Sequence, residues 1–136
     1  MKIRTDFVTN SSSSSFVIAY KPIEFSKEVT QKYPEVSIID KLVNAFFGSE
    51  GEYGETCAGE IVKTITELHN YFEFEYGKNF AEDKYVLNLY NESKRYVTNG
   101  YTIVFKSIDY HDSASRDMLY DLSENLGSKF IILEDD

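Results

Sequence analysis

Cysteine is nearly absent from the sequence, which has a single thiol, Cys57, among 136 residues. One cysteine excludes an intramolecular disulfide and leaves no second thiol for a metal clip or a redox pair. This usage favours a reducing compartment. Long hydrophobic runs are missing as well, since no stretch reaches the roughly 18 residues of a membrane helix. The opening MKIRTDFVTN also lacks the apolar region of a signal peptide. We therefore expect a cytoplasmic protein with no membrane contact.

Basic residues are scarce relative to acidic ones. Lys and Arg total 14 against 23 Asp and Glu, so the net charge is −9. Nucleic-acid binding relies on basic patches that contact phosphates, and direct binding of nucleic acid is therefore not expected. Residues 49–76 hold seven glutamates and one lysine, and residues 109–136 hold eight acids and two basic residues. These two acidic blocks favour a basic protein as the partner.

Apolar residues are frequent enough for a folded core, because 42% of the chain is hydrophobic and 15% is aromatic. The length is that of one domain, so we expect a single domain over residues 1–136. Residues 11–15 are five consecutive serines, which have little to bury. They predict a mobile serine-rich loop at 9–15. The glycines, lysine and following helix of a phosphate-binding loop are not present there.

Hydrophobic patterning predicts a small sheet covered by helices. Apolar or alternating runs predict strands near residues 16–20, 101–108 and 129–133. Apolar residues spaced by three and four predict helices over 26–47 (broken at Tyr33-Pro34), 57–74, 80–97 and 113–126. The strand-helix-strand order at the end is typical of a crossover between parallel strands. The expected fold is therefore α/β or α+β, with a small mixed sheet covered by four to five helices.

The N-terminal block IRTDFVTNSSSSSFV, residues 3–17, resembles the opening of many uncharacterised bacterial and bacteriophage proteins. Those proteins commonly begin with a short basic stretch, then F-V-(T/S)-N-S-S-S-S-S-F and an apolar strand. The block covers about a ninth of the chain and has no settled biochemical role. The resemblance implies a bacterial or phage origin, and hence the cytoplasm of a bacterium or of a phage-infected host.

A first candidate site follows the predicted strand 101–108. Asp109, His111 and Asp112 lie between that strand and the next predicted helix, where ligands commonly bind in α/β sheets. Two carboxylates and an imidazole can hold a divalent metal ion, or a His–Asp pair can move protons. A structural role is the alternative, because Asp112 also suits the N-cap of the following helix.

A second candidate site is the acidic stretch with its interleaved aromatic residues. Glu60 and Glu67 are seven residues apart, so a helix over 57–74 would place them on one face. We predict that this stretch binds a basic partner, through Glu50, Glu52, Glu55, Glu60, Glu67, Tyr71, Glu73, Glu75 and Tyr76. The alternatives are a solvated face that maintains solubility and, for the aromatic residues, the rim of the core.

These observations lead to one main functional hypothesis. The chain is expected to be a non-catalytic protein-interaction module of bacterial or phage origin, with an acidic, Tyr-rich face that binds a basic protein. It would act, for example, as an inhibitor of a nucleic-acid-handling or host-defence protein. The alternative is a small metal-assisted hydrolase or nucleotide-binding protein with its site at the end of strand 101–108. We expect no cofactor, and a homo-oligomeric structural component remains a third hypothesis.

Overall fold

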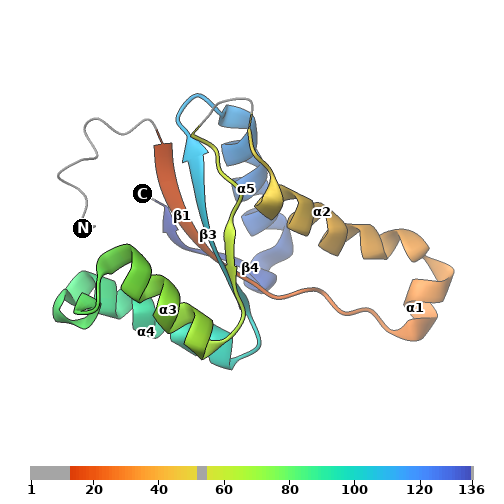
Figure 1. Cartoon of the computed structure of the whole chain (residues 1–136). Helices are drawn as coiled ribbons and strands as arrows, with labels where there is room; N and C mark the ends of the chain where they lie inside the picture. Colours follow the sequence, from red (N-terminus) through yellow and green to blue (C-terminus); the bar gives the residue numbers. More distant parts are fainter. Residues whose placement is uncertain (1–12, 52–54, 136) are drawn as a thin grey trace.

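The computed structural model describes residues 13–51 and 55–135, which form one small sheet with helices on both faces (Figure 1). The strands are β1 (Ser13–Tyr20), β2 (Glu60–Val62), β3 (Thr102–Asp109) and β4 (Phe130–Asp135). The α-helices are α1 (Lys27–Lys32), α2 (Ile38–Gly48), α3 (Ile65–Tyr76), α4 (Lys84–Thr98) and α5 (Ser113–Leu126). Short 3-10 turns are η2 (Pro34–Ser37), η3 (Phe80–Glu82) and η4 (Gly127–Lys129). The predicted combination of a small sheet with covering helices is confirmed.

The strand order is β2-β3-β1-β4, and each pair of neighbours is antiparallel. Strands β3 and β4 both run antiparallel to β1, so they are parallel to each other, as the strand-helix-strand pattern predicts. They are not neighbours, however, because β1 lies between them, and β3-α5-β4 is a split β-α-β unit. The sheet is therefore antiparallel rather than mixed.

Two segments differ from the sequence-based prediction. Residues 13–15, predicted as part of a mobile loop, belong to β1, where they pair with the end of β3. Residues 9–12 of that predicted loop lie outside the described residues. Residues 60–62, predicted as helix, form β2, and α3 begins only at Ile65. Thr64 caps that helix: its hydroxyl accepts from the backbone N–H of Glu67, whose carboxylate accepts from the N–H of Thr64, a capping box that stops the helix from extending toward β2.

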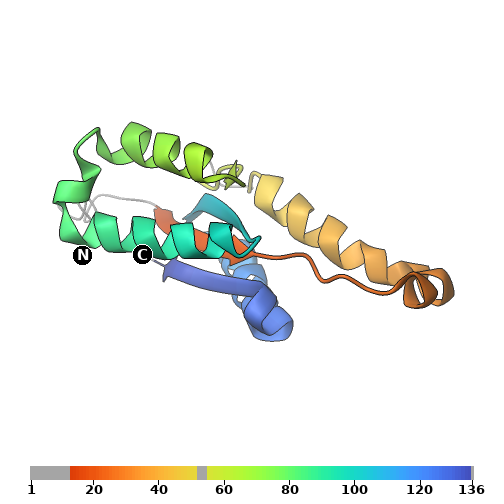
Figure 2. The same cartoon turned by 90° about the horizontal axis from the view of Figure 1, so that it is seen from below.

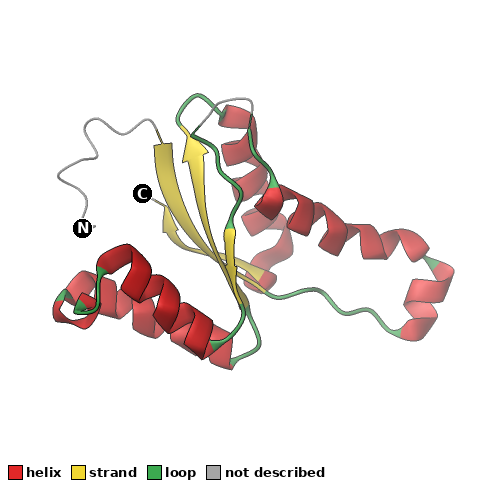
Figure 3. Ribbon diagram, viewed as in Figure 1, coloured by secondary structure: helices red, strands yellow, loops and turns green. Residues whose placement is uncertain are grey.

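The core has two halves, one on each face of the sheet. Helices α3 and α4 lie on one side of the sheet and α2 and α5 on the other (Figures 1 and 2). Alternate residues of a strand point to opposite faces, and β1 shows this directly. Phe16, Ile18 and Tyr20 pack toward α2 and α5, whereas Val17 and Ala19 pack toward α3 and α4. All five are at most 4% exposed. The continuous apolar run at 16–20 is thus explained by helices that cover both faces, as Figure 3 also shows.

Helix ends follow local sequence signals. Gly77 after α3 has φ of 92° and Gly127 after α5 has φ of 57°, backbone conformations that glycine adopts without a steric penalty. Among the residues that the structure describes, no helix is long and apolar enough to span a membrane.

Candidate functional site

Two adjoining cavities lie where α3 approaches the sheet. The first, of about 260 Å³, is lined by residues of α3, β1, β3, β4 and the segment before β2. The second, of about 480 Å³, lies between α3 and β2. Glu60, Tyr71 and Glu75 line both cavities. We call the two cavities together the acidic groove, defined by Glu60, Glu67, Tyr71, Phe74, Glu75, Tyr76 and Glu134.

The groove is built on an aromatic contact between α3 and β3. The ring of Tyr71 stacks on the ring of Phe105, with centroids 3.8 Å apart and planes 15° apart. Phe72, the next residue of α3, is fully buried and also packs on Phe105. Residues three and four positions beyond Tyr71 share its helix face, which places Phe74 and Glu75 along the groove. The Phe74 side chain is 86% exposed.

Glutamates outnumber basic residues in the lining of both cavities, and Lys106, in the first cavity, is the only lysine or arginine among the lining residues. Glu60, Glu75 and Glu134 line the first cavity, and Glu60, Glu67 and Glu75 line the second. The pKa of Glu67 is lowered by hydrogen bonds from the backbone N–H groups of Lys63 and Thr64. This glutamate therefore has a structural role in the capping box as well as a place in the groove.

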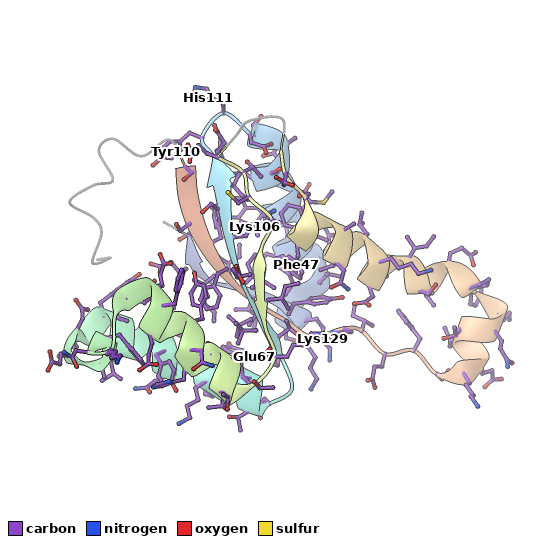
Figure 4. All side chains as sticks on the ribbon, viewed as in Figure 1. Phe47, Glu67, Lys106, Tyr110, His111 and Lys129 are labelled. Carbon is purple, nitrogen blue, oxygen red and sulfur yellow. The ribbon has the colours of Figure 1, made fainter. Side chains whose placement is uncertain are left out.

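A buried lysine lies on the opposite face of β3 from Tyr71. Lys106, labelled in Figure 4, is 2% exposed. Its ammonium donates to the carbonyl oxygens of Ser49 and Cys57, each at 2.8 Å. It also lies over the ring of Phe46, 5.4 Å from the centroid. Burial lowers the pKa of this ammonium, and the charges of nearby acidic groups oppose that shift. Lys106 thus joins the end of α2 to the segment that leads into β2 and the groove.

The structure brings together some, but not all, of the predicted partner-binding residues. Five of the predicted residues line the groove: Glu60, Glu67, Tyr71, Glu75 and Tyr76. The prediction that Glu60 and Glu67 share a helix face is wrong, because Glu60 lies in β2 and only Glu67 lies in α3. They meet across the second cavity instead.

The remaining predicted residues lie elsewhere or outside the described part of the chain. Glu73 faces His69, with its carboxylate 3.7 Å from Nδ1. Glu50 lines a different cavity beside His111, and Glu55 is exposed in the segment before β2. Glu52 falls in the gap between the described ranges. Two groove residues, Phe74 and Glu134, are not among the partner-binding residues predicted from the sequence. Phe74 stands in the aromatic run of 71–76, whereas Glu134 reaches the groove only through strand pairing.

Asp112, from the candidate site at Asp109, His111 and Asp112, is held by hydrogen bonds at the start of α5. The Asp112 carboxylate accepts hydrogen bonds from the backbone N–H of Ser115 (3.0 Å), the Ser115 hydroxyl (2.8 Å) and the Thr56 hydroxyl (2.8 Å). It is the N-cap of α5, in agreement with the structural alternative. The Thr56 hydroxyl also accepts from the Asp109 N–H at 2.9 Å.

Asp109 is oriented by its own loop. Its carboxylate accepts from the backbone N–H of His111 at 2.8 Å and lies 3.3 Å from the His111 Nδ1. The His111 ring is exposed at the tip of this loop (Figure 4). Within residues 13–51 and 55–135, no three His, Cys, Asp or Glu side chains are grouped so that they could hold a metal ion. The hydrogen bonds of Asp109, Asp112 and Thr56 join β3, α5 and the segment before β2, and we call this contact the junction.

Acid should weaken this junction. Burial alone would raise the pKa of Asp112, but hydrogen bonds from Ser115 and Thr56 and the charge of Arg116 lower it below its ordinary value. The unfolded chain therefore takes up the proton first as pH falls, and stability is lost below about pH 4. We expect the stability difference between the wild type and Asp112→Asn, which keeps a capping side chain but cannot titrate, to shrink between pH 5 and pH 3. Urea unfolding at several pH values measures this difference.

The control for this prediction is Asp121→Asn, which removes an exposed carboxylate from the same helix. Its pH profile should run parallel to that of the wild type. If the Asp112→Asn profile is also parallel to the wild type, the Asp112 carboxylate does not contribute to the acid-sensitive junction.

No protein-family model, curated protein or solved structure matches this chain. The function therefore has to be inferred from the geometry of the chain itself.

Proposed function

We propose that this chain is a protein-interaction module whose acidic groove binds a basic segment of a partner protein. The observation that carries the proposal is the meeting of four glutamates with the exposed ring of Phe74 and the partly buried rings of Tyr71 and Tyr76 at two adjoining cavities. Bacterial or phage origin, implied by the resemblance of residues 3–17, is part of the same proposal. An inhibitor of a nucleic-acid-handling or host-defence protein would use the groove in this way.

The chemistry of the groove suits lysine and arginine side chains. Carboxylates such as those of Glu60 and Glu75 form charge-assisted hydrogen bonds with ammonium and guanidinium groups. The exposed face of Phe74 can receive the same cations or their aliphatic stems. Phosphate groups would be repelled by the glutamates, which is why we propose a protein partner and not a nucleic acid.

The free edge of β2 limits how the partner is held. The Gly59 N–H donates to the Phe47 carbonyl at 2.7 Å, and the Lys63 N–H donates to the Glu67 carboxylate at 2.9 Å. Alternate residues of a strand direct their backbone groups to the same side, so the residue between them, Ile61, has its backbone groups on this edge. One residue offers little for strand addition, and such blocked edges are common in native sheets. The partner would therefore be held mainly by side chains.

The first test is binding of a synthetic peptide that alternates lysine and leucine, compared with the same peptide carrying glutamate for lysine. We expect the basic peptide to bind and its affinity to fall at higher salt, since screening shortens the range of charge interactions. The double variant Glu60→Lys/Glu75→Lys should bind at least about tenfold more weakly, mostly through slower association. Glu67 is left intact because its carboxylate is part of the capping box. Surface plasmon resonance at 50 and 300 mM salt measures both rates.

The matched control is Asp117→Lys/Glu124→Lys, which makes the same change in net charge at two exposed positions of α5. This control should bind the peptide with little change. Equal loss of affinity in both double variants would show that the overall charge of −9 attracts the peptide and that the groove does not. Salt-independent binding would likewise contradict the proposal.

A further inference from the structure

The segment between β1 and the second half of α2 projects away from the sheet (Figures 1 and 2). We call residues 21–42 the arm; it includes α1, η2 and the first part of α2. No residue of α1 or η2 is buried. The end of α2, in contrast, anchors the segment through Val43, Phe46 and Phe47, which belong to the core.

The arm exposes large apolar side chains. Of the nine large apolar side chains exposed among the described residues, five lie on the arm. Their exposed fractions range from 37% to 57%, and they are Phe25, Val29, Tyr33, Ile38 and Leu42. Large apolar surfaces that remain in water mark interaction sites.

Two of these residues form a ridge on α2. Ile38 and Leu42 are four residues apart and therefore lie on one face of the helix, with Ala45 continuing the row. The buried face of the same helix carries Val43 and Phe47. Helix α2 thus has one apolar face in the core and a second in water.

The arm is balanced in charge, unlike the chain as a whole. The arm holds four lysines and four acidic residues, whereas the whole chain carries −9. A two-fold interface joins a surface to an identical copy of itself, so it must be complementary to itself. A surface with one sign of charge repels its copy, but a charge-balanced apolar surface does not. The acidic groove fails this condition, and the arm meets it.

We infer that the arm is the contact between two copies of this chain. The Ile38 and Leu42 ridge of α2 packs antiparallel against the same ridge of a second copy. In this arrangement Ile38 of one protomer lies opposite Leu42 of its partner, and the two-fold axis passes between them. The acidic grooves remain outside the contact, so each protomer keeps its own groove.

Sedimentation equilibrium of the full chain from about 1 to 500 µM tests this inference. We expect a monomer–dimer equilibrium that becomes tighter with salt, because two copies that each carry −9 repel less when screened. Ile38→Glu/Leu42→Glu should raise the dissociation constant at least about 30-fold, as expected for the centre of an interface. Both side chains are exposed, so the thermal melt of the variant at low concentration should match that of the wild type.

Tyr110→Glu/Ala114→Glu is the matched control, since it adds the same two charges at exposed positions outside both the arm and the acidic groove. This variant should dimerise like the wild type. A wild type that is monomeric at every concentration would overturn the inference, and so would a dimer that persists in Ile38→Glu/Leu42→Glu. A monomer destabilised by these substitutions would instead show that the arm packs against its own chain.

Discussion

A chain that ends at Gly127 is expected to lose its cooperative unfolding transition. The truncation removes β4, whose pairing with β1 covers one side of that central strand. It also removes Phe130, which is fully buried and stacks on Phe47 with ring centroids 5.8 Å apart. Tyr20 packs on the edge of the same ring. The last strand therefore completes both the sheet and an aromatic cluster that joins β1, α2 and β4.

The size of the expected effect follows from the burial of one side chain. Phe130→Ala alone should lower the free energy of unfolding by about 3–5 kcal/mol, the usual cost of removing a buried phenylalanine. Domains of this kind are stable by about 5–15 kcal/mol in total. Truncation removes three further apolar residues, Ile131, Ile132 and Leu133, that are partly buried against the two halves of the core. The shortened chain should then be insoluble or lack fixed tertiary packing.

Thermal melting followed by far- and near-UV circular dichroism measures this effect. Leu133→Ala is the control, because this residue is only partly buried and lies at the irregularity in the β1–β4 pairing. It should melt cooperatively with a modest loss of stability. A truncated chain that melts cooperatively near the wild-type temperature would show that β4 is dispensable for the fold.

Most elements of the fold could be predicted because their apolar residues are patterned locally. Helix α5 occupies residues 113–126 as predicted, since its leucines recur at helical spacing and Gly127 follows them. Strand β2 could not be predicted in this way. Three residues are too short for a pattern, and β2 is a strand because Glu60–Val62 pairs with residues 103–105 of β3. Strand order is likewise a tertiary property, so the antiparallel position of β1 between β3 and β4 was missed.

Only the part of the groove that lies on one helix could be predicted from the sequence. Tyr71, Glu75 and Tyr76 are near neighbours on α3, so the sequence alone indicates that they gather. Glu134 approaches them only because β4 pairs with β1 and places Glu134 opposite Val17. Glu73 leaves the set because it lies on another face of α3, toward His69. Local spacing therefore predicts the helical half of the groove, and pairing across the sheet decides the other half.

Lys106 is the least expected feature of the sequence, because a lysine within an alternating strand would normally reach solvent. In β3 it is buried, and its ammonium lies between the end of α2 and the segment that leads into β2. That segment also gains a hydrogen bond from the Gly59 N–H to the Phe47 carbonyl. The segment before Glu60 is thus joined to the end of α2 by the buried ammonium of Lys106, a residue that also contributes to the lining of the first cavity.

Lys106→Met should therefore destabilise the fold and also weaken the binding of a basic peptide to the groove. Hydrogen bonds to a charged donor contribute about 1.5–3 kcal/mol each, and two short ones are lost, to Ser49 and Cys57. Removal of the desolvation cost of the buried charge offsets part of this loss, so we expect the free energy of unfolding to fall by about 2–4 kcal/mol.

The control is Lys63→Met, at an exposed lysine beside β2, which changes the net charge equally and should lose little stability. Urea unfolding and basic-peptide binding, measured on both variants, check the two effects. Equal stability of the two variants would mean that Lys106 does not hold the segment before β2. A destabilised Lys106→Met that still binds the basic peptide like the wild type would mean that the groove forms without it.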